Sequence, residues 1–495
     1  MADPLLLALD QGTTSTRAIL FDAAGRPLRT ASRPLDQSYP ADGWVEHDPE
    51  AIHRACVEVL AEAVERSGRR VEDIAALGIT NQRETVVVWD KATGSPIHPA
   101  IVWQDRRTAD ACARLSDAED EVAQVTGLRL DPYFSATKIA WILNHVSGAR
   151  AGAERGELLC GTIDTWVLWR MTGGAVHATD ATNASRTLLY DIEAQAWSPR
   201  MMALFGVPEA MLPEVRDTCA DFGEIGADIL GRALPVRALV GDQQSALMGQ
   251  GCIRAGDMKA TYGTGCFMLL NTGEQRPVSR ARLLATVAAR VNGRATYALE
   301  GSIFIAGAAI QWIGEGLGVT GGPAAVEDLA RRARPGHGVI LAPAFTGLGA
   351  PWWDADARGA IFGLTRDVGL PEIAEAAFDA AAFQTRDLIE AMRADAPHAF
   401  GAGSELRIDG GMASSAWFAR RLADLTGQAI GRVTYQETTA LGAALFAGLG
   451  AGVYGSMDEA AAHRPEAETY APELDLHVRE AAYARWLDAI ARVRS

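Results

Sequence analysis

The stretch LALDQGTTSTRAILFD, residues 7–22, places two short apolar runs on either side of a polar turn. Glycine and hydroxyl residues between two strand-forming runs are typical of a β-hairpin, and Asp10 then lies at the tip. Several backbone N–H groups and hydroxyls beside one carboxylate suit a metal-bridged polyphosphate, because the donors meet the phosphate oxygens and the carboxylate holds the cation, directly or through water. An ordinary polar turn has the same pattern, so this stretch alone leaves both interpretations open.

Length and charge narrow the class of protein. A chain of 495 residues exceeds one typical core and predicts two or three domains. With 48% apolar and 22% charged residues the composition is globular. The formal net charge of −16 (46 basic minus 62 acidic residues) argues against a nucleic-acid-binding protein. Any phosphate must therefore be held by local groups.

Lysines and cysteines exclude further kinds of site. The chain has three lysines, Lys91, Lys138 and Lys259, and none precedes Ser or Thr, so the end of a P-loop motif is absent. The six cysteines form no C-x-x-C pair, which favours reduced thiols over a metal site or a disulfide framework and predicts a cytoplasmic protein. The N-terminus lacks a basic region and the most apolar segment, Ile303 to Ile313, is short, so we expect neither an export signal nor a membrane span.

The rest of the chain alternates helical and strand patterns. Residues Ile52 to Glu65 predict a helix, and Ile74 to Thr80 and Thr85 to Trp89 predict strands. The stretch KATYGTGCFMLLN, residues 259–271, repeats the strand, Gly-Thr turn and strand of residues 7–22 about half a chain length later. Two similar lobes, each presenting a hairpin to a shared site, would explain this repeat, and coincidence is the alternative.

Two further glycine-containing elements follow. In LRIDGGMASSAWFARRLADLTG, residues 406–427, a short strand leads through Gly410 and Gly411 to a helix that Ser414 or Ser415 can cap and Gly427 ends. We expect this helix to bury Trp417, Phe418, Leu422 and Leu425. In GSIFIAGAAIQWIG, residues 301–314, Gly307 and Gln311 lie four apart on one face of a predicted helix, for which plain packing is the alternative role.

Together these motifs resemble the FGGY carbohydrate kinase family, in its order and spacing, from residue 7 to about residue 450. The motifs are LALDQGTTSTRA, ITNQRETVVVW, AIVWQDRR, DPYFSATKIAWIL, GTIDTWVLW, TDATNASRT, GDQQSALMGQ, TYGTGCFM, PAFTGLGAPWWD, RGAIFGLTR, DGGMASS and TALGAAL. The resemblance implies an α/β fold of two actin-like (ribonuclease H-like) lobes, each a mixed β-sheet flanked by helices, with a deep cleft between them. We expect the lobes to comprise residues 1–250 and 251–495.

Phosphoryl transfer to a hydroxyl needs a base for its proton and groups that balance the phosphate charge. The resemblance gives Asp242, in VGDQQSAL, the role of that base, and places Asp10 near magnesium. An Asp at a strand end is otherwise most often a cap or an ion-pair partner.

The resemblance also supplies an acceptor site whose composition is that of the members that phosphorylate glycerol. A small polyol needs paired donors and acceptors on one side and apolar walls on the other. Arg83 and Glu84 are the donor fork and the acceptor, and their alternative role is a surface ion pair. The other implied contacts are Trp103, Tyr133, Asp242, Gln243 and Phe267. Aromatic side chains are usually core, and we expect Trp141 and Trp166 to be core.

For ATP, the resemblance carries over residues from both hairpins and from the two later elements. These residues are Gly12, Thr13, Thr14, Ser15, Arg17, Thr264, Gly307, Gln311, Gly411 and Ser415. Ser415 departs from the pattern, because a relative has an amide side chain at that position. Residues 226–237, GADILGRALPVR, also depart from the glycine-rich loop with Lys and Arg by which bacterial relatives bind fructose 1,6-bisphosphate, so we expect weak or no control by that sugar phosphate.

The resemblance therefore predicts transfer of the γ-phosphate of MgATP to the terminal hydroxyl of glycerol, with ATP and Mg²⁺ as cofactors and Asp242 as the general base. It also predicts a homodimer or homotetramer. Two alternatives remain: a sister kinase acting on a longer polyol or a sugar such as xylulose, and a non-catalytic actin-like protein that uses ATP as a conformational switch.

Overall fold

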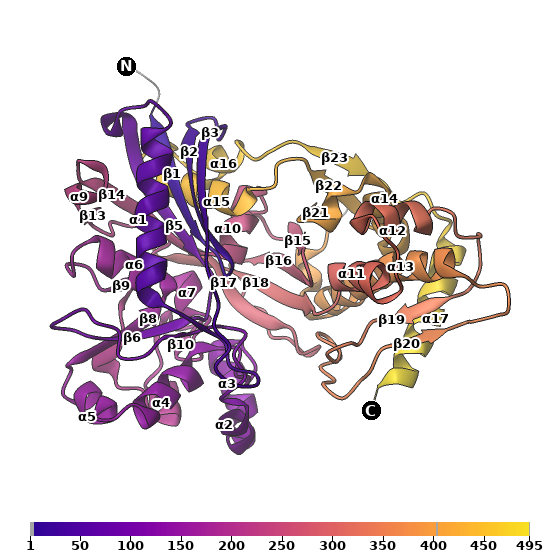
Figure 1. The fold of residues 1–495 in the computed structure, drawn as a ribbon, viewed down its shortest axis with the longest axis horizontal. Coiled ribbons are helices and arrows are strands. Elements are labelled where there is room, and N and C mark those ends of the chain that lie inside the picture. The colour runs from indigo at the N-terminus through magenta and orange to yellow at the C-terminus, as the bar shows by residue number, and fades with distance from the viewer. Residues whose placement is uncertain (1–3, 402–403, 495) are drawn as a thin grey trace.

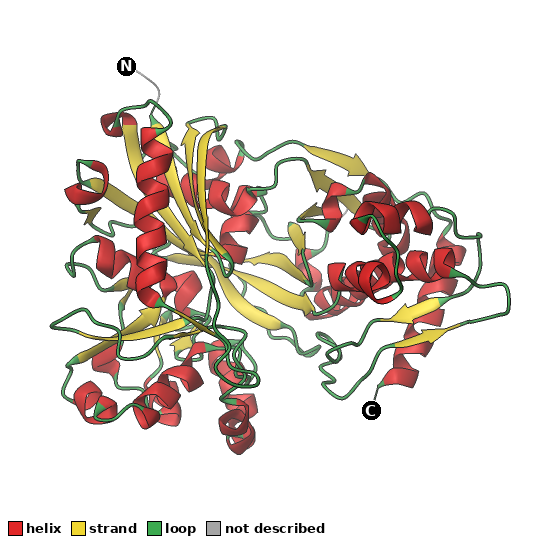
Figure 2. Cartoon of the chain, in the orientation of Figure 1, coloured by secondary structure: helices red, strands yellow, loops and turns green. Residues whose placement is uncertain are grey.

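The computed structural model describes residues 4–401 and 404–494, which form two lobes, each built around a mixed β-sheet with helices against it (Figures 1 and 2). The two-lobed α/β architecture expected from the sequence is confirmed. The described part of the chain holds no helix long and apolar enough to cross a membrane.

The sheet of the first lobe begins with the predicted hairpin. Its order is β13 (Glu224–Ile225), β14 (Leu234–Gly241), β5 (Ile74–Asn81), β1 (Leu5–Gln11), β2 (Ser15–Asp22) and β3 (Pro27–Pro34). Strands β1 and β2 are antiparallel and pair Asp10 with Arg17, so the hairpin is confirmed. Strands β5 and β14 run parallel to β1, and their carboxyl ends therefore meet at one edge of the sheet.

The sheet of the second lobe repeats this order. It comprises β17 (Leu284–Val291), β18 (Arg294–Ile303), β16 (Cys266–Gly273), β15 (Met258–Tyr262), β21 (Glu405–Asp409), β22 (Ala429–Val433) and β23 (Ala467–Tyr470). Strands β15 and β16 form the second predicted hairpin, and β21 and β22 run parallel to β15. The order β18-β16-β15-β21-β22 thus corresponds to β3-β2-β1-β5-β14, which explains the repeat in the sequence.

The first lobe carries a smaller layer at the lower left of Figure 1. Its sheet has the order β4 (Glu46–His47), β7 (Ala100–Ile101), β6 (Val86–Asp90) and β8 (Leu158–Thr162), so the second predicted strand is confirmed as β6. The short strands β10 (Tyr190–Asp191), β11 (Ala196–Trp197), β9 (Ala178–Asp180) and β12 (Glu214–Arg216) lie nearby. The helices of this lobe are α1 (Pro49–Glu65), α2 (Ala109–Arg114), α3 (Glu119–Thr126), α4 (Ser135–His145), α5 (Ala149–Glu154), α6 (Ile163–Met171), α7 (Ala181–Ala184), α8 (Pro199–Phe205), α9 (Ala227–Leu230) and α10 (Asp242–Gly249).

Helix α1 shows why these residues fold locally as they do. Asp48 caps its first turn by accepting a hydrogen bond from the N–H of Glu50, and Pro49 occupies the first helical position. The apolar residues at helical spacing, including Ile52, Val59 and Leu60, are buried against the sheet. The predicted helix is therefore confirmed, with its start three residues earlier.

The helices of the second lobe surround its sheet on the right of Figure 1. They are α11 (Gly307–Gly316), α12 (Gly322–Ala330), α13 (Leu370–Asp395), α14 (Ala416–Thr426) and α17 (Leu476–Val493), with the strand pair β19 (Ile340–Ala342) and β20 (Ala360–Phe362). In α14, Ser415 is the N-cap, accepting from the N–H of Phe418, and Gly427 ends the helix in the left-handed conformation, as predicted. Phe418, Leu422 and Leu425 are buried, whereas Trp417 is only partly buried.

One segment of the second half packs on the first lobe. Helix α15 (Thr438–Gly450) lies against β1, β5 and α10, and α16 (Met457–Ala461) follows it there. The approach is close because a Cβ at Gly442 would lie 1.8 Å from the carbonyl oxygen of Ser245, and one at Gly78 would lie 2.1 Å from that of Ala443. The division of the chain at residue 250 stays a prediction, because 438–461 belong spatially to the first sheet.

Two expectations about buried side chains have different outcomes. Trp166 is fully buried and packs edge-on against Trp89, so its core role is confirmed. Trp141 is only partly buried at the edge of the core, where it stacks on His145 and packs against the guanidinium of Arg107, whose side chain is itself buried. All six cysteines are free thiols, and five of them are buried, whereas Cys219 is partly exposed.

Candidate active site

Three adjacent parallel strands deliver the charged residues of the site to one edge of the first sheet. Asp10 lies near the end of β1, Arg83 and Glu84 follow β5, and Asp242 directly follows β14 as the first residue of α10. The register pairs Asp10 with Thr80 and Gly241 with Asn81. Sites at the carboxyl ends of parallel strands are a general property of α/β sheets, because the loops there converge.

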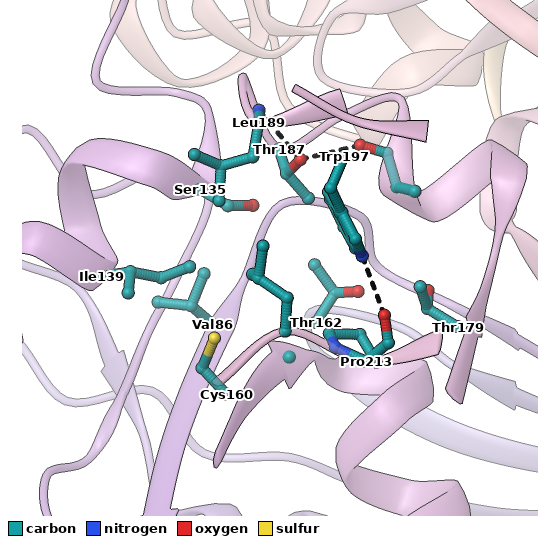
Figure 3. A pocket seen from close by; sticks show the side chains of 13 residues that line it. Val86, Ser135, Ile139, Cys160, Thr162, Thr179, Thr187, Leu189, Trp197 and Pro213 are labelled. Carbon is teal, nitrogen blue, oxygen red and sulfur yellow. Dashed lines mark hydrogen bonds between the residues drawn. The ribbon is translucent and has the colours of Figure 1, made fainter. Parts of the chain in front are cut away.

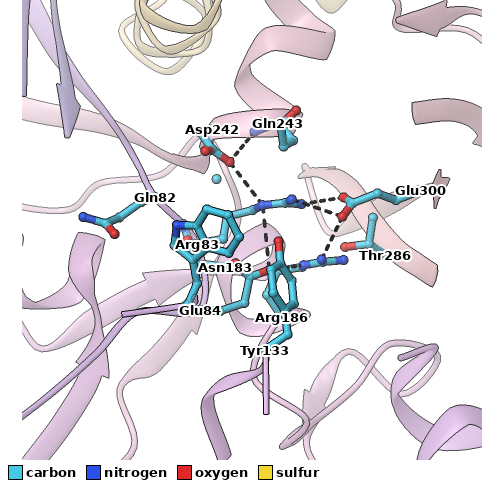
Figure 4. A network of polar contacts seen from close by, with 12 residues as sticks. Gln82, Arg83, Glu84, Tyr133, Asn183, Arg186, Asp242, Gln243, Thr286 and Glu300 are labelled. Atoms are coloured by element: carbon cyan, nitrogen blue, oxygen red, sulfur yellow. Dashed lines mark hydrogen bonds and ion pairs between the residues drawn. The ribbon is translucent and has the colours of Figure 1, made fainter. Parts of the chain in front are cut away.

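Arg83 is the centre of a buried polar network (Figure 4). Its Nε lies 3.1 Å from Oδ1 of Asp242. Its Nη1 donates to Oε2 of Glu300 at 2.7 Å and to Gln244 at 3.2 Å, and Nη2 donates to Oε1 of Glu300 at 3.2 Å. The surface ion pair considered as an alternative is thus wrong for Arg83, whose side chain is only 2% exposed.

Glu84 lies beside Arg83 in a strained backbone conformation. Its φ of 63° is in the left-handed region, which non-glycine residues rarely adopt and which is common at functional sites. Its Oε1 accepts from Nε of Arg186 at 2.6 Å. Burial raises the pKa of Glu84, while the guanidinium groups of Arg83 and Arg186 oppose that shift. The two arginines are therefore what favours the charged form of this buried carboxylate.

Three aromatic rings stand beside this network. Trp103 makes edge-to-face contacts with Tyr133, at 5.4 Å between ring centroids, and with Phe267 of the second lobe, at 6.3 Å. All three rings are partly buried. The structure thus brings together the aromatic residues that the sequence assigned to the polyol pocket, and it draws them from three separate segments of the chain.

Asp242 and Gln243 connect the site to the second sheet. The side chain of Asp242 is 30% exposed and accepts from the N–H of Gln243 at 2.7 Å. The amide oxygen of Gln243 accepts from Nζ of Lys259, a fully buried lysine of β15 whose ammonium also donates to Thr261. Burial lowers the pKa of Lys259, and the carboxylates of Asp409 and Asp242 oppose that shift.

Asp10 lies within electrostatic range of Asp242. Burial raises the pKa of Asp10 to about 7, Arg17 opposes the shift, and the charges of Asp242 and Glu437 reinforce it. Two neighbouring carboxylates suit a divalent cation. No three His, Cys, Asp or Glu side chains are grouped to hold a metal alone in residues 4–401 and 404–494, so a cation here would need further oxygen ligands from water or a phosphate.

The turn of the first hairpin joins these carboxylates to the aromatic wall. Gly12 donates its N–H to the carbonyl of Ser15 at 2.9 Å, which closes the turn tightly. Nε1 of Trp103 donates to Oγ1 of Thr13 at 2.9 Å, and Arg17 pairs with Glu437 at 3.2 Å. Thr14 is exposed at the tip, with its hydroxyl open to a ligand.

The second group of residues assigned to ATP lines one cavity of about 1050 Å³ in the second lobe. Thr264, Gly307, Gln311, Gly411 and Ser415 all border it. Gly307 has to be glycine, because a Cβ there would lie 2.4 Å from the carbonyl oxygen of Gly263 in the second hairpin. The first hairpin residues do not line this cavity, so the two predicted halves of the ATP site occupy different lobes.

A separate, small cavity in the first lobe contains none of the predicted residues. It lies between Val86, Ile139 and Trp197, where Nε1 of Trp197 donates to the carbonyl of Pro213 (Figure 3). Its volume of about 10 Å³ is that of a single water at most.

Three residues at the site were not predicted from the sequence: Arg186, Lys259 and Glu300. Each is a fully buried charge. A signal was present for Glu300, because a charged residue inside the apolar strand ATYALEGSI needs an ionic partner. Arg186 likewise lies in the motif TDATNASRT, to which no role was given.

Comparisons with known proteins show which family the two halves of the chain resemble. The N-terminal domain of the FGGY family of carbohydrate kinases matches residues 5–249, and the C-terminal domain of that family matches residues 258–451. The chain is 53% identical over 492 residues to "Glycerol kinase" of Ectopseudomonas mendocina, with 99% of each chain covered, and 53% identical to "Glycerol kinase 1" of Pseudomonas aeruginosa with the same coverage.

Solved structures support the fold. The crystal structure of Plasmodium falciparum glycerol kinase with ADP is similar at a TM-score of 0.93 and 33% identity, covering 99% of this chain and 98% of that one. A gluconate kinase from Lactobacillus acidophilus has a TM-score of 0.90 at 19% identity, with 99% and 98% covered, and this likeness concerns the fold alone.

Proposed function

This chain belongs to the FGGY family of carbohydrate kinases, and we propose that it transfers the γ-phosphate of ATP to the terminal hydroxyl of glycerol, giving sn-glycerol 3-phosphate and ADP. Relatives of 53% identity over almost the whole chain are glycerol kinases, and one of the similar solved structures is a glycerol kinase with ADP. The observation that carries the proposal is the pairing of Arg83 with Asp242 beside the rings of Trp103, Tyr133 and Phe267.

The acceptor site has the hydrogen-bond donor, the acceptor and the apolar walls that a three-carbon triol needs. Arg83 keeps one N–H of Nη2 without a partner among the described residues, and Oε2 of Glu84 accepts no described hydrogen bond. A donor beside an acceptor can hold two neighbouring hydroxyls, while the aromatic rings contact the carbon frame. Because burial raises the cost of an unpaired donor, a substrate lacking one of these hydroxyls binds less well.

Asp242 acts as the general base in this proposal. It is the most exposed of the charged residues in the network, so an acceptor hydroxyl can reach it. Its oxygen takes the proton as the hydroxyl oxygen attacks the γ-phosphorus and the bond to the β-phosphate oxygen breaks. Gln243, held by Lys259, is a further contact for the substrate.

Mg²⁺ is proposed beside Asp10. This carboxylate would hold the cation directly or through water, and when bound the cation neutralises charge on the phosphates. Thr13, Thr14, Ser15 and the N–H groups of the first turn bind the phosphates from one lobe, with Arg17 adding a positive charge. Thr264, Gly307, Gln311, Gly411 and Ser415 bind the nucleotide from the other, at the cavity of about 1050 Å³.

We also propose that the protein works in the cytoplasm. We propose further that it is a homodimer or homotetramer, and light scattering of the purified protein tests this oligomeric state. The reaction itself is tested by measuring ADP release from MgATP with glycerol, xylulose or no acceptor. Glycerol-dependent release supports the proposal, release with xylulose alone favours a sugar kinase, and release that no acceptor stimulates favours an ATP-dependent switch.

A further inference from the structure

The second lobe contributes the carboxylate of Glu300 to the acceptor site. Glu300 lies in β18 and pairs across the sheet with Leu269 of β16. Side chains two residues apart on a strand share a face, so Glu300 is on the same face as Phe267, the aromatic residue at the site. The strand thereby directs a charge toward Arg83 and Arg186 of the first lobe (Figure 4).

Glu300 joins two arginines that would otherwise repel each other. Its Oε1 accepts from Nη2 of Arg186 at 2.9 Å and from Nη2 of Arg83 at 3.2 Å, and its Oε2 accepts from Nη1 of Arg83 at 2.7 Å. Burial alone would raise the pKa of Glu300, but the guanidinium groups of Arg186 and Arg83 lower it to about 2. The two arginines therefore favour the charged form of this buried carboxylate.

The centre of the network pairs opposite charges away from solvent, and Asp242 lies at its more exposed edge. Arg83 and Arg186 supply two positive charges, Glu84 and Glu300 two negative charges, and all four side chains are at most 2% exposed. Arg186 bridges the two carboxylates, with 2.6 Å from its Nε to Oε1 of Glu84. Loss of Glu300 would remove the carboxylate that lies between the guanidinium groups of Arg83 and Arg186, and buried charges that lose their partner are costly.

The donors of Arg83 show what that loss would do to the substrate. Glu300 takes one N–H from each terminal nitrogen, Gln244 takes the second N–H of Nη1, and Nε faces Asp242. This two-point contact fixes the plane of the guanidinium, because bidentate pairs between arginine and a carboxylate have a defined geometry. If the contact with Glu300 were lost, the carboxylate nearest to Arg83 would be that of Asp242, at 3.1 Å.

We propose that Glu300 is a positioning residue for phosphoryl transfer, which holds Arg83 so that its remaining N–H points to an acceptor hydroxyl instead of turning toward Asp242. Arg186 has the corresponding role for Glu84. The inference rests on the proposed function, since it names the residues that set the geometry of that acceptor site. It also means that both lobes build the site for the smaller substrate.

The test is Glu300→Gln, which keeps the size of the side chain and removes its charge. Measured on the purified full-length enzyme, the KM for glycerol is expected to rise by roughly 10- to 100-fold, as for loss of a hydrogen bond to a charged group, and the KM for ATP to change by less than about 2-fold. Calorimetric titration with glycerol alone is expected to show a similar increase in the Kd for glycerol, and it does not rely on turnover.

Asp387→Asn is the matched control. Asp387 is a buried carboxylate of the same lobe that accepts from Trp486 at 2.9 Å and Tyr483 at 2.7 Å, with no contact to the acceptor site. A merely structural effect of losing a buried carboxylate lowers the active fraction, and so kcat, in both variants and leaves both KM values unchanged. If Glu300→Gln does not fold, Glu300→Asp keeps the charge but cannot reach both arginines, and a several-fold rise in the glycerol KM is expected.

An unchanged glycerol KM and Kd in the variant that folds would overturn the inference. A wild-type enzyme that does not phosphorylate glycerol would instead overturn the proposed function, so the two failures are distinguishable.

Discussion

The guanidinium of Arg83 lies 3.1 Å from Oδ1 of Asp242, although the two residues follow different strands, β5 and β14, of the first sheet. The contact forms because these strands are parallel neighbours and end at the same edge. Arg83 is almost fully buried, whereas 30% of the Asp242 side chain is exposed. The carboxylate is thus oriented by a fixed cation and still accessible to a substrate, as a general base has to be.

Asp242→Asn tests that role. The amide cannot accept the proton of the acceptor hydroxyl, so kcat is expected to fall by roughly 10²- to 10⁴-fold, the usual effect of losing a general base. Size and hydrogen-bonding shape are preserved, and glycerol is expected to bind with a Kd within several-fold of the wild-type value. Steady-state rates together with calorimetric titration check both statements. Turnover close to the wild-type value would remove Asp242 from the mechanism.

Arg83→Ala tests the acceptor site. The change leaves a substrate hydroxyl and Glu300 without their partner, so the KM for glycerol should rise far more than the KM for ATP. Arg54→Ala is the control, because Arg54 forms an exposed ion pair with Asp48 on α1. Initial rates with each substrate varied in turn give the two constants. Equal increases in both would contradict the assignment of Arg83 to the polyol.

Gly307→Ala tests the nucleotide cavity. An added Cβ would lie 2.4 Å from the carbonyl oxygen of Gly263, so helix α11 and the second hairpin would have to separate. We expect the KM for ATP to increase by about 10-fold or more, in line with the cost of overpacking. Gly152→Ala on α5 is the control, since Gly152 does not line this cavity and the nearest contact of an added Cβ is at 3.6 Å. Similar ATP constants for the two variants would show that Gly307 is not needed for the cavity.

Asp387 predicts part of the pH dependence of stability. Burial raises its pKa to about 7 in the folded protein, although hydrogen bonds from Trp486, Tyr483 and Trp352 oppose the shift. Its unfolded value is about 4, so between these values the folded state binds more protons. The free energy of unfolding therefore decreases as pH rises through that range.

Asp387→Asn removes this titration, and the decrease in Tm between about pH 5 and about pH 8 is expected to be smaller than in the wild-type protein. Asp458→Asn is the control, because Asp458 pairs with Arg254 at the surface. Thermal unfolding at both pH values measures the difference. An equal decrease in Tm over this pH range in the Asp387→Asn variant and in the wild-type protein would contradict the role given to Asp387.

Short-range patterns were enough to predict much of the fold. Both hairpins, helix α1 and the capped helix α14 follow from apolar periodicity, turn glycines and a serine N-cap, which act within a few residues of each other. The repeat of a Gly-Thr turn half a chain apart indicated two lobes of similar topology, and the strand orders agree with this.

Long-range packing was not predictable in the same way. Nothing local in the glycine- and alanine-rich helix α15 indicates that it packs on the first sheet, because the close approach at Gly442 depends on Ser245 almost 200 residues earlier in the chain. Glu300 and Arg186 were not predicted because their burial depends on ion pairs with each other and with Arg83 and Glu84, which are far away in the chain. Trp141 was expected in the core and is only partly buried at its edge, since aromatic character alone does not distinguish a core ring from one that packs against a cation and a histidine.

The most direct test of the central claim is ADP release from MgATP by the purified protein, measured with glycerol, with xylulose and with no acceptor, and with identification of the phosphorylated product. The account predicts release that requires glycerol and yields glycerol 3-phosphate in equal amount. Equal release with and without any acceptor, or release with xylulose but not glycerol, would contradict it.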